Sequence, residues 1–148
     1  MVWRRDLDGK RAPEPAADRR TAIARLALAG RQVGLLGYDK GEPVAWCSIA
    51  PRGYFDAGLS PTPDQPGLWS LTCFFIRADH RRQSGFAALL SAAEALARQN
   101  GATAVETYPV DPDSPSYRFA GFVPSFEKAG YAEIGRTGQR RHILRKTL

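Results

Sequence analysis

One stretch of the sequence, residues 71–101, constrains the fold more than any other. An apolar run from Leu68 to Ile76 enters a basic turn with small residues at its centre, and a long amphipathic pattern follows and ends at Gly101. The apolar run lacks the alternation of a half-exposed strand, so we expect a central strand covered on both faces. Because the first turn of a helix carries unpaired N–H groups and the positive end of the dipole, this stretch predicts an anion site.

The pattern after the turn predicts a helix with one apolar face. That face holds Phe86, Leu89, Leu90, Ala93, Leu96 and Ala97. Glu94 and Arg98 stand four residues apart on the other side, a spacing that predicts a surface ion pair. A further strand is expected over residues 103–108, and strand, helix and strand in this order predict a crossover with parallel strands.

The flanking segments complete a mixed sheet. A helix over residues 19–29 with Asp18 as N-cap, and a hairpin of residues 32–38 and 43–48, precede the central strand. Residues 51–67, rich in Pro and Gly, predict a long loop that is either functional, for example a lid, or disordered. An irregular segment over 109–123, a short helix over 125–129 and strands over 131–136 and 141–145 follow. This order indicates an α/β (α+β) fold with a mixed central β-sheet flanked by helices.

Length and composition indicate a single domain. The 148 residues suffice for one hydrophobic core, and we expect a basic N-terminal arm over 1–17 followed by one domain over 18–148. No apolar run approaches the roughly 20 residues of a membrane span. The N-terminus lacks the apolar segment of a secretory signal, so a cytoplasmic location is expected.

Neither cysteine suggests a disulfide or a metal site. Cys47 and Cys73 lie in predicted strands and are interpreted as small core residues. Only His80 and His142 could join them as ligands, and the spacing fits no metal motif, so no metal is expected.

The chain is basic, with 21 Lys and Arg against 15 Asp and Glu and a net charge of +6. The positive residues are spread along the chain without interleaved aromatic residues, and no nucleic-acid motif is present. The distribution of charge therefore disfavours nucleic acid as the main ligand and favours an anionic small molecule.

Two motifs occur in a fixed order. The first is a turn of the form Arg or Gln, two residues, Gly, one residue, Gly or Ala, placed between a strand and a helix. The second is Tyr or Phe, three residues, then Gly and an aromatic residue, here Phe126 to Tyr131. With these motifs, about residues 33–148 resemble the GCN5-related N-acetyltransferase (GNAT) superfamily, which transfers an acyl group from acetyl-coenzyme A to a primary amine.

The phosphate-binding turn of this resemblance has two registers. Arg82, Gly85 and Ala87 fit the motif literally, whereas spacing to the flanking elements favours Arg81 as first residue, with Ser84 and Phe86 where glycines are usual. We favour Arg81. In either register the diphosphate would meet backbone N–H groups of residues 82–87. The resemblance thus implies cofactor contacts by Arg81, Arg82, Gln83, Ser84, Gly85, Phe86, Ala87 and Phe126.

The resemblance also implies where acetyl-CoA would bind as co-substrate. Its pantetheine arm would run along the end of the central strand against backbone groups of Phe74, Phe75 and Ile76. The strand over 103–108 would splay away to admit it. An amide N–H near Phe75 would stabilise the oxyanion of the tetrahedral intermediate.

The acid and the base are less defined. Glu106 and Tyr108 share a face of their strand, so they could border one cavity and supply the base, with Asp111 just beyond; a structural role for Glu106 is the alternative. The family often has a tyrosine acid where this chain has Phe126, which has no proton to give. Ser125, Tyr117, water or unassisted thiolate departure could replace it. His80 is expected to be a surface or capping residue.

The expected function is acetyl transfer from acetyl-CoA to an unidentified amine by direct attack. The alternative is a non-catalytic acyl-CoA-binding or regulatory module. The N-terminal part is shorter than is usual in the superfamily. A partner chain in a homodimer, or the loop over 51–67, could supply the missing part of the amine pocket.

Overall fold

The structure is a computed structural model that describes residues 4–10, 16–81 and 85–148. Its elements are α1 (Ala16–Leu28), β1 (Leu35–Asp39), β2 (Glu42–Pro51), β3 (Leu68–Ile76), α2 (Gly85–Gln99), β4 (Ala104–Thr107), α3 (Val123–Glu127), β5 (Ala132–Thr137) and β6 (Arg141–Thr147). Four short 3₁₀ helices are η1 (Arg52–Tyr54), η2 (Ala57–Leu59), η3 (Ala78–His80) and η4 (Arg118–Ala120). Within the described ranges, no helix is both long and apolar enough to cross a bilayer.

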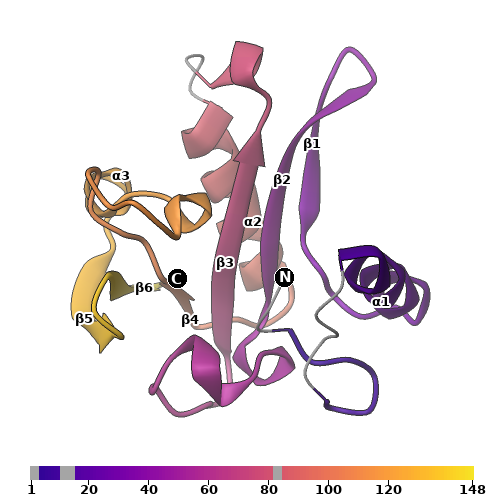
Figure 1. The fold of residues 1–148 in the computed structure, drawn as a ribbon, viewed down its shortest axis with the longest axis horizontal. Coiled ribbons are helices and arrows are strands. Elements are labelled where there is room, and N and C mark those ends of the chain that lie inside the picture. Colours follow the sequence, from indigo (N-terminus) through magenta and orange to yellow (C-terminus); the bar gives the residue numbers. More distant parts are fainter. Residues whose placement is uncertain (1–3, 11–15, 82–84) are drawn as a thin grey trace.

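The strands form one six-stranded sheet in the order β1-β2-β3-β4-β6-β5. β3 and β4 are parallel, and every other neighbouring pair is antiparallel (Figure 1). α2 connects the two parallel strands and lies along one face of the sheet. The predicted mixed sheet, the hairpin and the β-α-β crossover are therefore confirmed.

Each face of the sheet has its own apolar cluster. On the α2 face, Leu89, Leu90, Ala93 and Ala97 pack with strand residues such as Cys47 and Leu71. On the other face, Ala50, Phe55, Leu59, Tyr108 and Ile143 pack together. The first five residues of β3 are buried, which confirms a central strand covered on both sides.

The expected ion pair between Glu94 and Arg98 is wrong. Glu94 is only 6% exposed, and its carboxylate accepts hydrogen bonds of 3.1 and 2.9 Å from Nζ of Lys146 on β6. The amphipathic pattern marks this side of α2 as polar, but in the fold it lies over the last strand. The buried carboxylate consequently pairs across the structure rather than along the helix.

The segment between β2 and β3 is packed rather than disordered. Phe55 and Leu59 are buried, and the buried Arg52 donates a 2.9 Å hydrogen bond to the carbonyl of Ser60. Because these apolar side chains belong to the second core cluster, moving the segment as a lid would expose core surface.

The N-terminal residues depart from the expected arm. Arg4 is 2% exposed and forms an isolated antiparallel bridge with Phe55. α1 begins at Ala16, so Asp18 lies within its first turn rather than capping it. An unfolded arm is therefore wrong for Arg4, whereas the division into residues 1–17 and 18–148 stays a prediction.

Candidate active site

β3 and β4 separate in the middle of the sheet. The last pair between them is Leu71 with Thr107, where β4 ends. In the ladder with β2, Ser48 pairs with Cys73 while Ile49 pairs with Leu71, so Thr72 is an extra residue in a β-bulge. A bulge bends its strand and changes the direction of the residues after it. From the bulge to its end, β3 pairs with β2 but with no other strand of the described residues.

Strand alternation decides which backbone groups face the open side. Arg77 donates its N–H to the carbonyl of Val44 at 2.8 Å, so the antiparallel pattern turns Phe75 toward β2 and Phe74 and Ile76 away from it. The Ile76 carbonyl accepts a 2.8 Å hydrogen bond from Nε of Arg81. The N–H groups of Phe74 and Ile76 are therefore free at this edge in the described part of the chain. The sequence also suggested the Phe75 amide, which faces β2 instead.

α2 begins close to this open edge. A Cβ on Gly85 would lie 3.1 Å from the carbonyl oxygen of His80 and 3.6 Å from Cγ2 of Ile76, so glycine permits the close approach. This approach is what the glycine of the motif provides, which favours Arg82 as its first residue. Arg82, Gln83 and Ser84 themselves lie outside the described residues, and the register stays a prediction.

Four aromatic rings fill the space between β3, α2 and α3. Phe74, Phe86 and Phe126 have ring centroids 4.8 to 5.8 Å apart, and Tyr131 lies 5.4 Å from Phe126. Phe126 has no exposed surface. A Cβ built on Gly121 would lie 3.3 Å from Cζ of Phe126. A tyrosine at position 126 would therefore place its hydroxyl against the backbone at Gly121. Phe126 is thus part of the support beneath the open edge.

A groove of about 510 Å³ runs between α2 and α3. Phe86 and Ala87 line it at the start of α2, and Ser125 and Lys128 line it on the α3 side. Ser125 lines this groove. Glu106 and Tyr108, the other two predicted catalytic residues, do not belong to its lining.

Glu106 and Tyr108 meet on the opposite face of the sheet in a buried network. The Tyr108 hydroxyl lies 2.7 Å from Oγ of Ser70 and donates to Oε2 of Glu106 at 3.1 Å. Oε1 of Glu106 accepts from Nε of Arg145 at 3.1 Å and also from its Nη2. Burial, and then the charge of Glu106, raises the pKa of Tyr108. The Glu106 side chain is fully buried, and Tyr108 and Arg145 contact both of its carboxylate oxygens.

Sequence reasoning missed two histidine bridges. Nδ1 and Nε2 of the buried His142 lie 2.9 Å from Glu133 and 3.2 Å from Asp111, so β5, β6 and the segment after β4 are tied together. His80 lies 2.8 Å from Asp79 and 3.1 Å from Asp39. Asp39 and Asp111 lie 41 and 31 residues away from His80 and His142, a separation that local spacing does not reveal.

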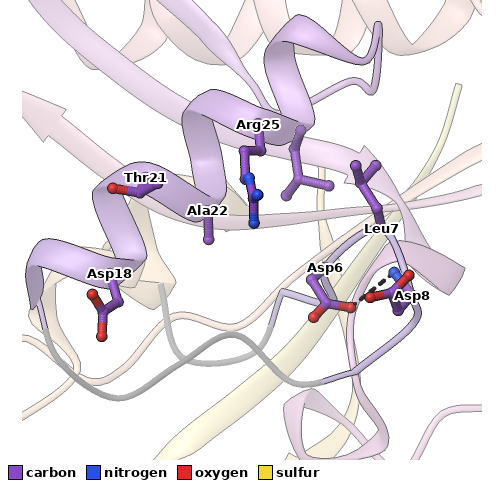
Figure 2. A pocket seen from close by; sticks show the side chains of 8 residues that line it. Asp6, Leu7, Asp8, Asp18, Thr21, Ala22 and Arg25 are labelled. Atoms are coloured by element: carbon purple, nitrogen blue, oxygen red, sulfur yellow. Dashed lines mark hydrogen bonds between the residues drawn. The ribbon is translucent and has the colours of Figure 1, made fainter.

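Another cavity, of about 540 Å³, lies between α1 and residues 6–8. Figure 2 shows Asp18 on the helix and Asp6 and Asp8 on the facing segment, with Arg25 between them. Among the described residues that line this cavity, none was proposed above for acyl transfer.

Solved structures share this fold. PaiA N-acetyltransferase from Thermoplasma acidophilum, in complex with coenzyme A, matches with a TM-score of 0.65 at 10% identity, over 90% of this chain and 72% of that one. Ribosomal-protein-alanine N-acetyltransferase from Brucella melitensis matches with a TM-score of 0.59 at 15% identity, over 91% of this chain and 80% of that one. Ard1 from Thermoplasma volcanium matches with a TM-score of 0.57 at 14% identity, over 87% of this chain and 79% of that one. A search of curated protein sequences finds no significant match.

A family model agrees with the fold. The model of the acetyltransferase (GNAT) family matches residues 2–122, which include β3, the basic turn and α2 but end before the Phe126 to Tyr131 motif. With a match over most of its length and the sheet topology described above, the chain belongs to the GNAT family of acetyltransferases.

Proposed function

We propose that this protein is an acetyl-CoA-dependent N-acetyltransferase that acts on a primary amine by direct attack. The observation that carries the proposal is the open edge of β3, which offers free N–H groups at Phe74 and Ile76 beside the start of α2. Family membership supports acetyl transfer in general. The amine and the roles of individual residues are our inference.

The three parts of the site fit the three parts of acetyl-CoA. A pantetheine carbonyl would accept the N–H of Ile76, as an added strand does, which leaves the N–H of Phe74 for the thioester. The diphosphate would accept hydrogen bonds from the first turn of α2, where no intrahelical acceptor is available. The groove between α2 and α3 has room for the nucleoside, and Lys128 offers a cation to a phosphate there.

The reaction needs a donor for the developing oxyanion. The amine nitrogen would attack the thioester carbonyl carbon, and the resulting alkoxide oxygen would accept the N–H of Phe74, the first free donor after the bulge. Collapse of the intermediate forms the amide and breaks the C–S bond, so coenzyme A leaves as a thiolate. Burial raises the pKa of Cys47 and Cys73, which disfavours an acyl-cysteine intermediate and supports direct attack.

Proton transfer would rely little on the residues suggested by sequence. Glu106 is held by Arg145 and Tyr108, and a phenol with a raised pKa is a poor proton donor to a thiolate. We therefore propose that Glu106 positions the end of β4. Both protons that the ammonium nitrogen loses, one before the attack and one from the tetrahedral intermediate, would pass to water, and the thiolate would leave without a side-chain acid.

The test is acetyl-CoA binding by calorimetry, together with amine-dependent thiol release across a panel of primary amines. Arg81→Ala combined with Arg82→Ala should weaken binding by about tenfold, or ~1.4 kcal/mol. Arg98→Ala, at the exposed far end of α2, is the control and should bind like the wild type. Absence of binding, or equal affinities in all three proteins, would refute the proposal.

The buried Phe126 and the engaged Glu106 favour one other function, a non-catalytic acyl-CoA-binding module. Both candidates bind acetyl-CoA, so turnover separates them. Thiol release that depends on the amine supports the transferase. Tight binding without release for any amine in the panel supports the module.

A further inference from the structure

A small cationic cavity lies away from the open edge of β3. Its volume is about 120 Å³, and Arg4, Arg5 and Arg31 line it together with Asp6 and Tyr54. A space of this size suits a phosphate or carboxylate group.

Arg4 is a buried cation that contacts no carboxylate among the residues the structure describes. Its Nη1 donates to the carbonyl of Gln32 at 3.0 Å, and its Nη2 donates to the carbonyl of Val33 at 2.8 Å and to Oγ of Ser48 at 3.0 Å. Its guanidinium also stacks on Phe55 at 4.6 Å. All of these acceptors are neutral, and Nε has no hydrogen-bond partner in the described part of the chain. Burial lowers the pKa of Arg4 to about 10, so the side chain keeps its charge near neutral pH.

The other charged side chains at the cavity do not neutralise Arg4. Arg31 stacks on the ring of Tyr54 at 4.8 Å, and neither it nor Arg5 forms an ion pair with a described residue. Oδ1 of Asp6 accepts the backbone N–H groups of Asp8 and Lys10 at 3.0 and 2.8 Å. Buried charges in proteins are normally paired, and this one has no anionic partner among residues 4–10, 16–81 and 85–148.

We propose that this cavity is a binding site for an oxyanion, a phosphate or carboxylate group, recognised by Arg4, Arg5 and Arg31. Guanidinium groups match the paired oxygens of a phosphate or a carboxylate. The three arginines that line the cavity outnumber its one lining carboxylate, Asp6, so the cavity has a local surplus of positive charge. The oxyanion belongs either to the acceptor molecule or to a separate ligand.

A hydrogen-bond chain connects this site to the open edge. Nη2 of Arg4 donates to Oγ of Ser48, which also accepts from Oγ1 of Thr72 at 3.0 Å. Thr72 is the bulge residue at which β3 leaves β4. An anion that moves Arg4 would therefore act on the segment that carries the proposed oxyanion donor.

The test is a titration with inorganic phosphate at constant ionic strength, followed by the Nε–Hε resonances of Arg4, Arg5 and Arg31. These resonances should shift with one dissociation constant. Arg31→Gln should weaken binding by about tenfold. Arg20→Gln removes the same charge from an exposed position on α1 and should leave binding unchanged. Resonances that do not move, or two variants with equal affinity for phosphate, would overturn the proposal.

A second experiment identifies the source of the oxyanion, and it rests on the proposed transferase function, whereas the phosphate titration does not. KM is compared for an amine that carries a carboxylate and for its carboxamide. If Arg31→Gln raises KM about tenfold for the carboxylate alone, the oxyanion belongs to the acceptor. If phosphate binds but both KM values are unaffected, the site holds a separate anion.

Discussion

Replacing Glu106 with Gln tests whether this residue positions the end of β4 or acts as a general base. The Glu106 side chain has no exposed surface, and its carboxylate accepts a 3.1 Å hydrogen bond from Nε of Arg145. Glutamine keeps the shape of the side chain and one acceptor oxygen but removes the negative charge. A charge-assisted hydrogen bond contributes about 1.5–3 kcal/mol and a neutral one about 1 kcal/mol. Because Arg145 is 28% exposed and can be partly hydrated, we expect a loss of about 2 kcal/mol in the free energy of unfolding.

Thermal unfolding measures this change, and a loss of that size should lower Tm by about 6 °C. Arg145→Met and the double variant complete a mutant cycle, whose coupling energy should be about 2 kcal/mol. With saturating substrates, kcat per folded enzyme should stay within about threefold of wild type. A variant of native stability with kcat reduced a hundredfold or more would show that Glu106 is the base and refute the reasoning.

Three further predictions concern the surroundings of the site. A hydrogen bond to Asp79 raises the pKa of His80 in the folded protein. Protonated His80 therefore stabilises the fold; this contribution is fully present below about pH 6.5 and is lost as the pH rises through the folded-state pKa. An NMR titration should show that Asp79→Asn lowers this pKa; no change would contradict the assignment. Gly121→Ala should cost about 3 kcal/mol, because φ is +87° and the new Cβ would meet the ring of Phe126 at 2.8 Å. Gly138→Ala, with φ +64° and open space, should cost only about 1 kcal/mol, and equal losses in chemical denaturation would contradict this reading. Phe126→Tyr should lower stability by about 1–3 kcal/mol without raising kcat, since the added hydroxyl would be buried against Gly121; faster turnover would show that it reaches the thiol.

The sequence predicts the fold well where the signal is local. The apolar run from Leu68 to Ile76 matches β3 at both ends. The hairpin turn at Lys40 and Gly41, both with positive φ, follows from local turn chemistry. Burial of Glu94 against Lys146 could not be predicted, because it depends on where the last strand crosses α2.

The candidate site divides in the same way. The strand-to-helix turn and its glycine are visible in the sequence, and Gly85 lies at the close approach to His80. The bulge at Thr72 depends on pairing with β2 and was not predictable from spacing. The burial of Arg4 likewise arises from contacts with Ser48 and Phe55, which are more than 40 residues away in the chain.

Amide hydrogen exchange with and without acetyl-CoA tests the open edge of β3 most directly. In the free protein, the Phe75 amide should be protected by β2, whereas those of Phe74 and Ile76 should exchange rapidly. Saturating acetyl-CoA should slow exchange at Phe74 and Ile76 and at the first turn of α2. Protection confined to other parts of the chain, with Phe74 and Ile76 unchanged, would contradict the proposed binding site.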